Sequence, residues 1–387
     1  MEHPVRITEI EAQNFKSLHK FRLQVPKFCC LTGLNGSGKS TVLQFLDFIA
    51  QQARGNISGW LDERGWKAAE LPCKLAKTSA VEFALRFNDS GKEISWSARF
   101  DYKSLRCVQE KIESNDITYL EVKSDQYAYQ NNGNSSDRSA LRPIEFKYQG
   151  SILSALVDEK LPKVLLHLRD FLRDIETLEM LTPERLRQRV REANGSLGLG
   201  GRNLAAFIHD LGEDKRRGLV ESLQGAYPQL RHLYSKKLRS GWKQLRIEEH
   251  FNSGMLATDA SHINDGTLRL LAVLAELASR HEVVIFDEIE NGINPELVEM
   301  LLKELQDSPK QVVLTTHSPL ILNYLDDATA KESVVFVYKN AHGFTQAKPL
   351  FEIPSLAEKL TVMGPGEAFA DTDLTTLSQQ LSSGQAA

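Results

Sequence analysis

The sequence predicts an α/β fold: a mixed, mainly parallel sheet with helices on both faces, preceded by antiparallel strands and carrying an inserted helical lobe. Three observations support this prediction. An apolar strand, a glycine-rich turn and an amphipathic helix follow one another between residues 28 and 54. From residue 245 onward, helical and strand patterns alternate, which is typical of a parallel sheet. Between these parts, residues 151–244 adopt mainly the period of helices.

The first part of the chain reads as strands before and after a single long helix. Apolar and polar residues alternate in the early segments, as in half-buried strands, and the later pair flanks the turn at 88–91. We expect strands at 5–14, 19–25 and 28–33, a helix from Ser40, and a hairpin with strands at 79–87 and 93–101.

The second part alternates helix and strand, with expected helices at 267–280 and 295–306 and apolar strands at 282–288 and 311–317. These patterns divide the chain into four segments. They are the N-terminal half of the α/β domain (1–150), a basic helical lobe inserted in it (151–244), the C-terminal half of the α/β domain (245–372) and a flexible tail (373–387).

Composition indicates a globular protein, with 41% apolar residues and a formal net charge of -4. No run of about 18 apolar residues occurs, and the first residues lack the pattern of a secretory signal. We therefore expect a cytoplasmic protein without a membrane partner. The cysteines show no metal-ligand spacing and no disulfide framework; they are Cys29, Cys30, Cys73 and Cys107.

Charge is unevenly distributed. Residues 160–247 hold 18 Lys and Arg against 10 Asp and Glu. Such a run is usually a solvated helical face, and the alternative is a surface that contacts nucleic acid, either DNA or RNA, or an acidic partner.

The strongest motif is a phosphate-binding loop that matches GxxxxGK[ST] between a strand and a helix. Its glycines allow backbone N–H groups to surround phosphates. We expect Lys39 to reach the β- and γ-phosphates of ATP and Ser40 to ligate Mg²⁺. The predicted nucleotide-binding residues are Gly33, Asn35, Gly36, Ser37, Gly38, Lys39, Ser40 and Thr41.

Two acids and a histidine follow the apolar strands of the second half. Asp287 is expected to contact Mg²⁺, and Glu288 to act as the general base on the attacking water. Two acids after an apolar strand are common by themselves, but the upstream loop favours the functional interpretation. His317 ends the next apolar strand, where ligands gather in parallel sheets, and is expected to sense the γ-phosphate.

In this order the motifs resemble the ATPase heads of the ABC superfamily, in the RecF, SMC and OLD-like branch. The matching stretches are ITEIEAQNFKSL, GLNGSGKST, HINDGTLRLLAVLAEL, FDEIENGINP and TTHSPLIL. They cover about residues 1–50 and 245–370 and leave the middle uncovered. The resemblance implies the P-loop NTPase fold of an ABC-type head and an activity that hydrolyses ATP to ADP and phosphate.

The resemblance also implies roles for residues that spacing alone leaves open. Asn264, Asp265 and Gly266 occupy the signature position, which contacts the γ-phosphate bound to the opposite subunit; Asn264 replaces the usual Ser. The segment 291–295 resembles the D-loop, and Phe15 with Lys16 resembles the residues near the adenine.

These roles imply a head-to-tail homodimer that encloses two ATP molecules. OLD-like relatives often carry a nuclease after the histidine motif, but only 70 residues follow His317 here, so we expect any nuclease or toxin effector to be a separate polypeptide. The favoured hypothesis is a nucleotide-timed sensor or clamp in anti-phage defence. The alternatives are a RecF-like mediator of DNA repair or recombination and, less favoured, the ATPase subunit of a transporter.

Overall fold

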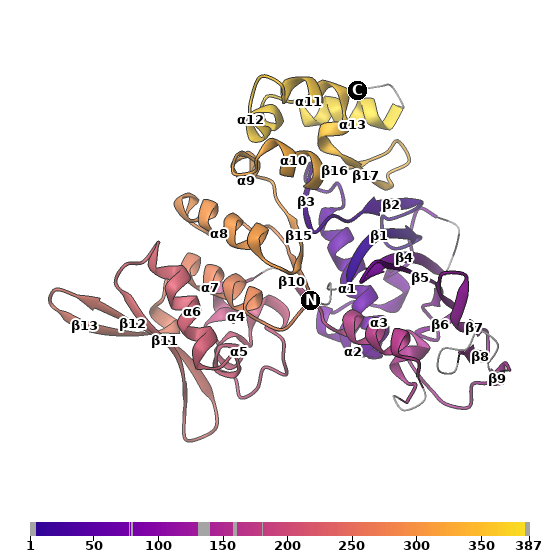
Figure 1. Ribbon diagram of the computed structural model, residues 1–387, viewed down its shortest axis with the longest axis horizontal. Helices are drawn as coiled ribbons and strands as arrows, with labels where there is room; N and C mark the ends of the chain where they lie inside the picture. The colour runs from indigo at the N-terminus through magenta and orange to yellow at the C-terminus, as the bar shows by residue number, and fades with distance from the viewer. Residues whose placement is uncertain are drawn as a thin grey trace. The chain divides into compact units, whose positions relative to one another are not determined.

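The computed structural model describes residues 5–76, 78, 80–130, 140–157, 161–179 and 181–383. The chain forms two compact units (Figure 1). Residues 1–175 and 325–387 make the first, here called the outer unit, and residues 176–324 make the second, here called the central unit. The four segments expected from the sequence were divided where the hydrophobic periodicity changes. The two units are defined by tertiary contacts, so their boundaries differ from the expected ones. Each unit is described by itself.

The outer unit contains an antiparallel sheet of eight strands in the order β2-β1-β4-β5-β6-β7-β8-β9 (Figure 1). The expected hairpin is confirmed: Asp89 pairs with Lys92 across a turn of Ser90 and Gly91, both with positive φ. The strands are β1 (Arg6–Gln13), β2 (Phe21–Gln24), β4 (Val81–Asp89), β5 (Lys92–Asp101), β6 (Arg106–Ser114), β7 (Ile117–Lys123), β8 (Gln126–Tyr129) and β9 (Arg142–Pro143).

A second group of strands in the outer unit includes the strand that precedes the phosphate loop. β3 (Phe28–Thr32) is buried along its whole length and pairs in parallel with β16 (Val334–Lys339), which pairs antiparallel with β17 (Thr345–Pro349). Full burial explains why β3 is apolar throughout and does not alternate. These strands come from opposite ends of the chain, so the fold brings both termini of the sequence to one unit.

Helix α1 (Lys39–Arg54) connects this group to the antiparallel sheet. Its residues Phe45 and Phe48 are fully buried, and both rings pack against Phe83 of β4. The shorter helices nearby are α2 (Ile57–Arg64), the 3-10 turns η1 (Ala68–Glu70) and η2 (Ile152–Ser154), and α3 (Lys163–Arg173).

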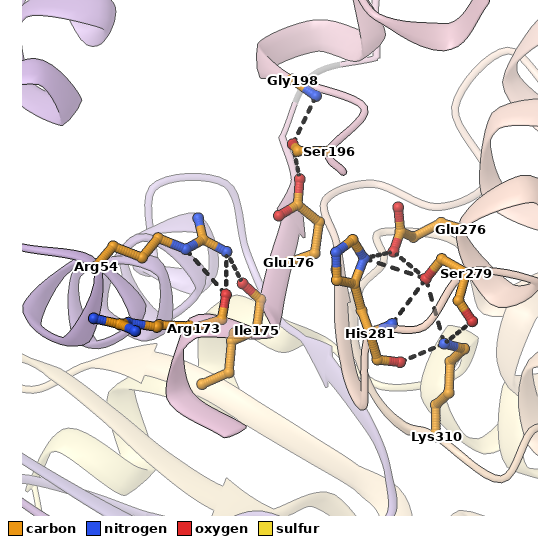
Figure 2. Close-up of polar contacts among 10 residues, drawn as sticks. All are labelled: Arg54, Arg173, Ile175, Glu176, Ser196, Gly198, Glu276, Ser279, His281 and Lys310. Atoms are coloured by element: carbon orange, nitrogen blue, oxygen red, sulfur yellow. Dashed lines mark hydrogen bonds and ion pairs between the residues drawn. The ribbon is translucent and has the colours of Figure 1, made fainter. Parts of the chain in front are cut away.

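The start of the expected helical lobe belongs to the outer unit. Arg54, at the end of α1, donates hydrogen bonds to the carbonyl oxygens of Arg173 (2.9 Å), the last residue of α3, and Ile175 (2.6 Å), the first residue of the next strand (Figure 2). Helical structure was expected across 151–244, but α3 ends at Arg173 and β10 (Ile175–Leu178) follows. The guanidinium satisfies carbonyl groups that the helix end leaves without partners.

The C-terminal segment was expected to be a flexible tail, but residues 374–383 form helix α13 (Leu374–Ser383). Leu377 is buried, and the Ser382 hydroxyl donates to the carbonyl oxygen of Lys339 at 2.6 Å. One apolar contact and one hydrogen bond therefore anchor a segment of polar composition. The other elements of this region are α10 (Asp327–Ser333), η6 (Leu350–Glu352), α11 (Pro354–Lys359) and α12 (Pro365–Ala370).

The first part of the central unit mixes helices and strands, so the expectation of a helical lobe is wrong for the segment from residue 230 onward, which forms antiparallel strands. Helical structure was expected throughout the lobe, but the first helix of this unit ends at Leu186, and Val190 beyond it exchanges backbone hydrogen bonds with Lys243. The helical elements are α4 (Pro183–Leu186), η4 (Leu199–Gly201), α5 (Leu204–Asp210) and α6 (Glu213–Gln224). The antiparallel strands are β11 (Leu230–Lys237), β12 (Lys243–Phe251) and β13 (Gly254–Asp259).

The rest of the central unit carries the helix and strand alternation that the sequence predicts. Strands β14 (Val283–Phe286) and β15 (Gln311–Thr315) are buried and parallel, so their carboxyl ends lie at the same edge. The helical elements are η5 (Ala260–His262), α7 (Asp265–Leu277), α8 (Pro295–Asp307) and α9 (Pro319–Asn323). Among the described residues, none of the helices has the length and apolar character needed to cross a membrane.

Candidate nucleotide site

The phosphate loop, residues 33–38, requires glycine for two reasons. Gly33, Gly36 and Gly38 all have positive φ. A methyl group added at Gly33 would lie 2.2 Å from the carbonyl oxygen of Val337, and one added at Gly38 would lie 2.1 Å from the Thr345 hydroxyl. A methyl group at Gly36 would meet nothing within 4 Å. The loop therefore lies tightly against β16 and β17 on one side and is open at its tip.

Lys39 closes the loop on itself. Its ammonium group is buried and donates to the carbonyl oxygens of Gly33 (2.9 Å) and Leu34 (3.1 Å). No side chain caps the first turn of α1, and the positive end of the helix dipole, which favours an anion, lies at the loop. This arrangement fits a nucleotide phosphate.

The remaining loop residues differ in exposure. Asn35 and Ser40 are exposed, Thr41 is partly buried and Ser37 is buried. Within the described chain, the Ser37 hydroxyl has no hydrogen-bond partner. Exposure of Ser40 at the start of α1 is consistent with its expected role toward a metal ion.

Thr345 supports the loop and was not predicted from sequence. Its hydroxyl donates to the carbonyl oxygen of Ser37 (2.9 Å) and lies 2.8 Å from the Ser17 hydroxyl. Its N–H donates to the carbonyl oxygen of Ser17. No sequence motif marks this threonine, because its relation to the loop exists only after β17 has folded beside it.

In the central unit, the two acids of the second motif follow β14. The Thr315 hydroxyl, at the end of β15, donates to the Asp287 carboxylate at 2.6 Å and accepts from the Glu288 N–H at 2.8 Å. Glu288 has φ 48°, a left-handed conformation that is uncommon for a residue with a side chain. The turn aims the Glu288 side chain away from the strand, and about half of that side chain is exposed.

The structure brings His317 beside these acids. Its Nε2 lies 3.7 Å from a Glu288 carboxylate oxygen, and Asn291 donates to the other oxygen at 3.3 Å. Glu290, which the sequence did not single out, accepts from the Thr316 hydroxyl (2.8 Å) and from the His317 N–H (2.9 Å). The Glu290 carboxylate thus holds the backbone of His317 in place.

The residues at the signature position form the start of α7. The Asn264 side chain accepts from the Thr267 N–H at 2.8 Å, so the residue that replaces the usual Ser acts as an N-cap. Asp265 forms an ion pair with Arg187. A methyl group added at Gly266 would lie 2.7 Å from the carbonyl oxygen of Gly292.

This close approach joins the signature position to the segment that resembles the D-loop. Arg269, one turn further along α7, donates to the carbonyl oxygen of Asn291 at 3.0 Å. Asn291 in turn contacts Glu288. Within one chain, therefore, the start of α7, the segment 291–292 and the acid at 288 are joined by direct contacts.

Phe15 and Lys16, which resemble residues near the adenine, have different surroundings. Phe15 is fully buried and packs on Phe48, so its ring is part of the core. The Lys16 ammonium lies 3.2 Å from the centre of the Trp66 ring and donates to Gln44 at 2.8 Å. Of this pair, Lys16 is partly exposed and Phe15 is buried.

No group of three or more His, Cys, Asp or Glu side chains arranged to hold a metal ion occurs among the described residues. The four cysteines are buried and form no disulfide with one another. A magnesium ion that accompanies a nucleotide needs only one or two protein ligands.

These features define the class of protein. The outer unit has a glycine loop that closes on a buried lysine, and the central unit has acids and a histidine at the ends of neighbouring parallel strands; each feature is typical of the P-loop NTPase fold. Residues 28–323 match the family described as "AAA domain, putative AbiEii toxin, Type IV TA system", and the chain belongs to this family. A comparison with curated proteins found no match.

Solved structures support the fold. One similar structure is an SMC head bound to the C-terminal winged-helix domain of ScpA, with a TM-score of 0.54, 15% identity, and coverage of 91% of this chain and 99% of that one. Another is the SMC head with an extended coiled coil from Pyrococcus furiosus, bound to the C-terminal domain of ScpA. Its TM-score is 0.53 at 14% identity, with coverage of 92% of this chain and 100% of that one. The mixed α/β fold predicted from sequence is confirmed.

Proposed function

We propose that this protein hydrolyses ATP to ADP and phosphate, and that two copies enclose two ATP molecules in a head-to-tail dimer. Lys39 and the amides of the loop would bind the phosphates. Ser40 and Asp287 would hold Mg²⁺, which neutralises phosphate charge when bound. The signature residues Asn264 to Gly266 would contact the nucleotide of the other copy.

The observation that carries the catalytic part is the position of Glu288. A left-handed turn fixes its backbone, the Thr315 hydroxyl holds its N–H, and its carboxylate lies near His317. In this proposal the carboxylate accepts a proton from the water that attacks the γ-phosphorus, the bond to ADP breaks, and His317 contacts the departing phosphate.

Glu288→Gln tests this role. The variant is expected to keep ATP binding, to slow hydrolysis by about two to four orders of magnitude, and to accumulate as an ATP-bound dimer in sedimentation. Glu296→Gln removes an exposed carboxylate at the start of α8 and serves as the control. Wild-type turnover in Glu288→Gln would exclude Glu288 as the base.

The biological setting that we propose is a sensor or clamp in anti-phage defence that works with a separately encoded partner, such as a nuclease or toxin. The family description names a putative toxin of a type IV toxin–antitoxin system, which supports a defence setting. The SMC heads of similar fold were solved with ScpA domains bound, which illustrates how such a head accepts a partner protein. Purification of the native complex with and without ATP tests this setting.

A nucleic-acid contact is a second candidate function, and one observation favours it. Residues 222–247 contain six Lys and Arg and no acidic residue. At the end of the β11–β12 hairpin, Lys236, Lys237 and Arg239 are exposed, and the Arg191 guanidinium lies 5.2 Å from the centre of the partly exposed Trp242 ring. Basic groups beside an aromatic ring are typical of single-strand binding surfaces.

Charge reversal at these three hairpin residues is expected to lower affinity for single-stranded DNA or RNA and to flatten its salt dependence. Reversal of Lys303, an exposed residue of α8, is the control. Unchanged affinity of the charge-reversed variant for single-stranded DNA and RNA would favour the interpretation that the basic residues are only a solvated surface. Retained DNA binding by a chain that purifies without a partner protein would favour the DNA-repair mediator over the defence sensor.

A further inference from the structure

A cavity of about 320 Å³ lies within the central unit, away from every residue assigned above to nucleotide. Its walls are the loop 193–195, the end of α5, the start of α6 and the turn 279–281 that precedes β14. This volume is at the lower end of the range of small-molecule sites, which is roughly 300–1,000 Å³.

The cavity has a positive rim. Lys215 and Arg280 both line it and are exposed, and their side chains form no hydrogen bond or ion pair with any other residue that the structure describes. The acidic residue in the lining, Asp210, is already paired with Lys243 at 2.8 Å. Two cations without acidic partners therefore face one small space, which favours an anion.

One wall of the cavity is apolar. It consists of Phe207, which is 4% exposed, with Leu211 and Ala193 beside it. An apolar wall next to convergent charged groups is the usual composition of a site for an organic ligand, because the wall supplies affinity and the charges fix orientation.

The floor of the cavity is rigidly built (Figure 2). Ser279 and His281 contribute to it, and both contact the buried Glu276 carboxylate: Ser279 donates through its hydroxyl at 2.9 Å, and His281 through Nδ1. The Lys310 ammonium donates to the carbonyl oxygens of Ser279 (3.2 Å) and His281. Glu276, His281 and Lys310 are all more than nine-tenths buried.

From these observations we propose that the cavity binds a small organic anion with a flat apolar part and a phosphate, sulfonate or carboxylate group. The acid group would lie between Lys215 and Arg280, and the apolar part against Phe207. This site does not depend on the proposed ATP chemistry. Because the turn 279–281 leads directly into β14, the occupant would lie at the opposite end of that strand from Glu288.

The test uses 1-anilinonaphthalene-8-sulfonate, an aromatic sulfonate that matches this description, with the 387-residue chain and no ATP. Fluorescence titration is expected to show one saturable site. Binding to this site should weaken by about tenfold or more in the double variant Lys215→Glu/Arg280→Glu, because two favourable charges become repulsive. The affinity of the milder double variant Lys215→Gln/Arg280→Gln for the probe should lie between the affinities of the Lys215→Glu/Arg280→Glu variant and of wild type.

The matched control is Arg217→Glu/Arg231→Glu, which makes the same change of net charge at two exposed residues outside the cavity lining. Its saturable site should be unchanged, and circular dichroism should show that all variants are folded. Identical titration curves for wild type and the cavity variants, or equal losses in the cavity and control variants, would overturn the proposal. Because no hydrolysis is measured, either result would leave the ATPase proposal untouched.

Discussion

The Thr315 hydroxyl donates a hydrogen bond to the Asp287 carboxylate at 2.6 Å and, with the same oxygen, accepts the N–H of Glu288 at 2.8 Å. A single side chain at the end of β15 therefore orients both acids that follow β14. The parallel pairing of these strands places Phe286 beside Leu314, which brings the residues after them together. The orientation of Asp287 and Glu288 thus depends on β15 as well as on β14, the strand that they follow.

We predict that Thr315→Val lowers ATP turnover by about tenfold to a hundredfold, because Asp287 loses a donor and the Glu288 N–H loses its acceptor. Thr315→Ser keeps the hydroxyl and should retain most of the activity. Steady-state phosphate release at saturating ATP measures both variants. Turnover of Thr315→Val equal to that of wild type would show that the hydroxyl does not position the acids.

Gly266 should be intolerant of any side chain. The added methyl group of Gly266→Ala would lie 2.7 Å from the Gly292 carbonyl oxygen, and we predict a loss of about 1–3 kcal/mol in the free energy of unfolding. At Gly218, inside helix α6, an added methyl group would meet nothing within 4 Å, and φ is not positive. Gly218→Ala should therefore stabilise by about 0.4–1 kcal/mol. Denaturant unfolding measures the free energy of unfolding of both variants. A change of the same sign in Gly266→Ala and Gly218→Ala would contradict the packing argument.

Stability should also depend on the protonation of Glu110. This side chain is buried in the outer unit and accepts from Trp96 (3.0 Å), from the Ile152 N–H (3.2 Å) and from the Ser151 hydroxyl. Burial raises the pKa of Glu110 to about 7, against the opposing effect of these hydrogen bonds. The folded protein therefore keeps a proton that the unfolded chain, in which this carboxyl has its ordinary pKa of 4.5, releases.

The contribution of this protonation to the free energy of unfolding is therefore fully present below about pH 4.5 and is lost as the pH rises to about 7. Within this window the free energy of unfolding falls by up to about 1.4 kcal/mol per pH unit. Between about pH 5 and about pH 7, wild type should lose more unfolding free energy than Glu110→Gln, which has no proton to release. Urea unfolding at the two pH values makes the comparison. Parallel losses in both proteins would place the pKa of Glu110 near its ordinary value.

Much of the candidate site could be predicted from sequence because its residues lie in short local motifs. Lys39 follows a glycine loop within one strand, turn and helix segment, and Asp287 and Glu288 directly follow an apolar strand. Local pattern is sufficient in such cases. The structure adds that His317 lies 3.7 Å from Glu288, which follows from the parallel pairing of two predicted strands.

The supporting residues could not be predicted, because their roles arise from contacts between distant parts of the chain. Thr345 meets the phosphate loop from more than 300 residues away, and Glu290 acts on the backbone of residue 317. Helix patterns also failed where tertiary pairing prevailed: Val190 bonds to Lys243, so the helix expected there ends early. Phe15, which resembled a ligand contact, belongs to the core.

In the proposed dimer, two copies complete each ATP site. Gly266 is a poor residue with which to test this arrangement, because it also packs on Gly292 within its own chain. Asp265 is better suited. Its side chain is 57% exposed and forms an ion pair with Arg187. Asp265→Tyr adds bulk at the start of α7 at the cost of this surface ion pair, a kind of interaction that typically contributes about 0–1 kcal/mol.

The most direct measurement is the ATPase rate of an equimolar mixture of Asp265→Tyr and Lys39→Ala chains, compared with each variant alone. Both variants should be nearly inactive by themselves. If sites form between copies, about half of the dimers are mixed and each contains one intact site, so the mixture should regain about a quarter of wild-type turnover. A mixture no more active than the average of its two components would contradict a site completed by the second copy.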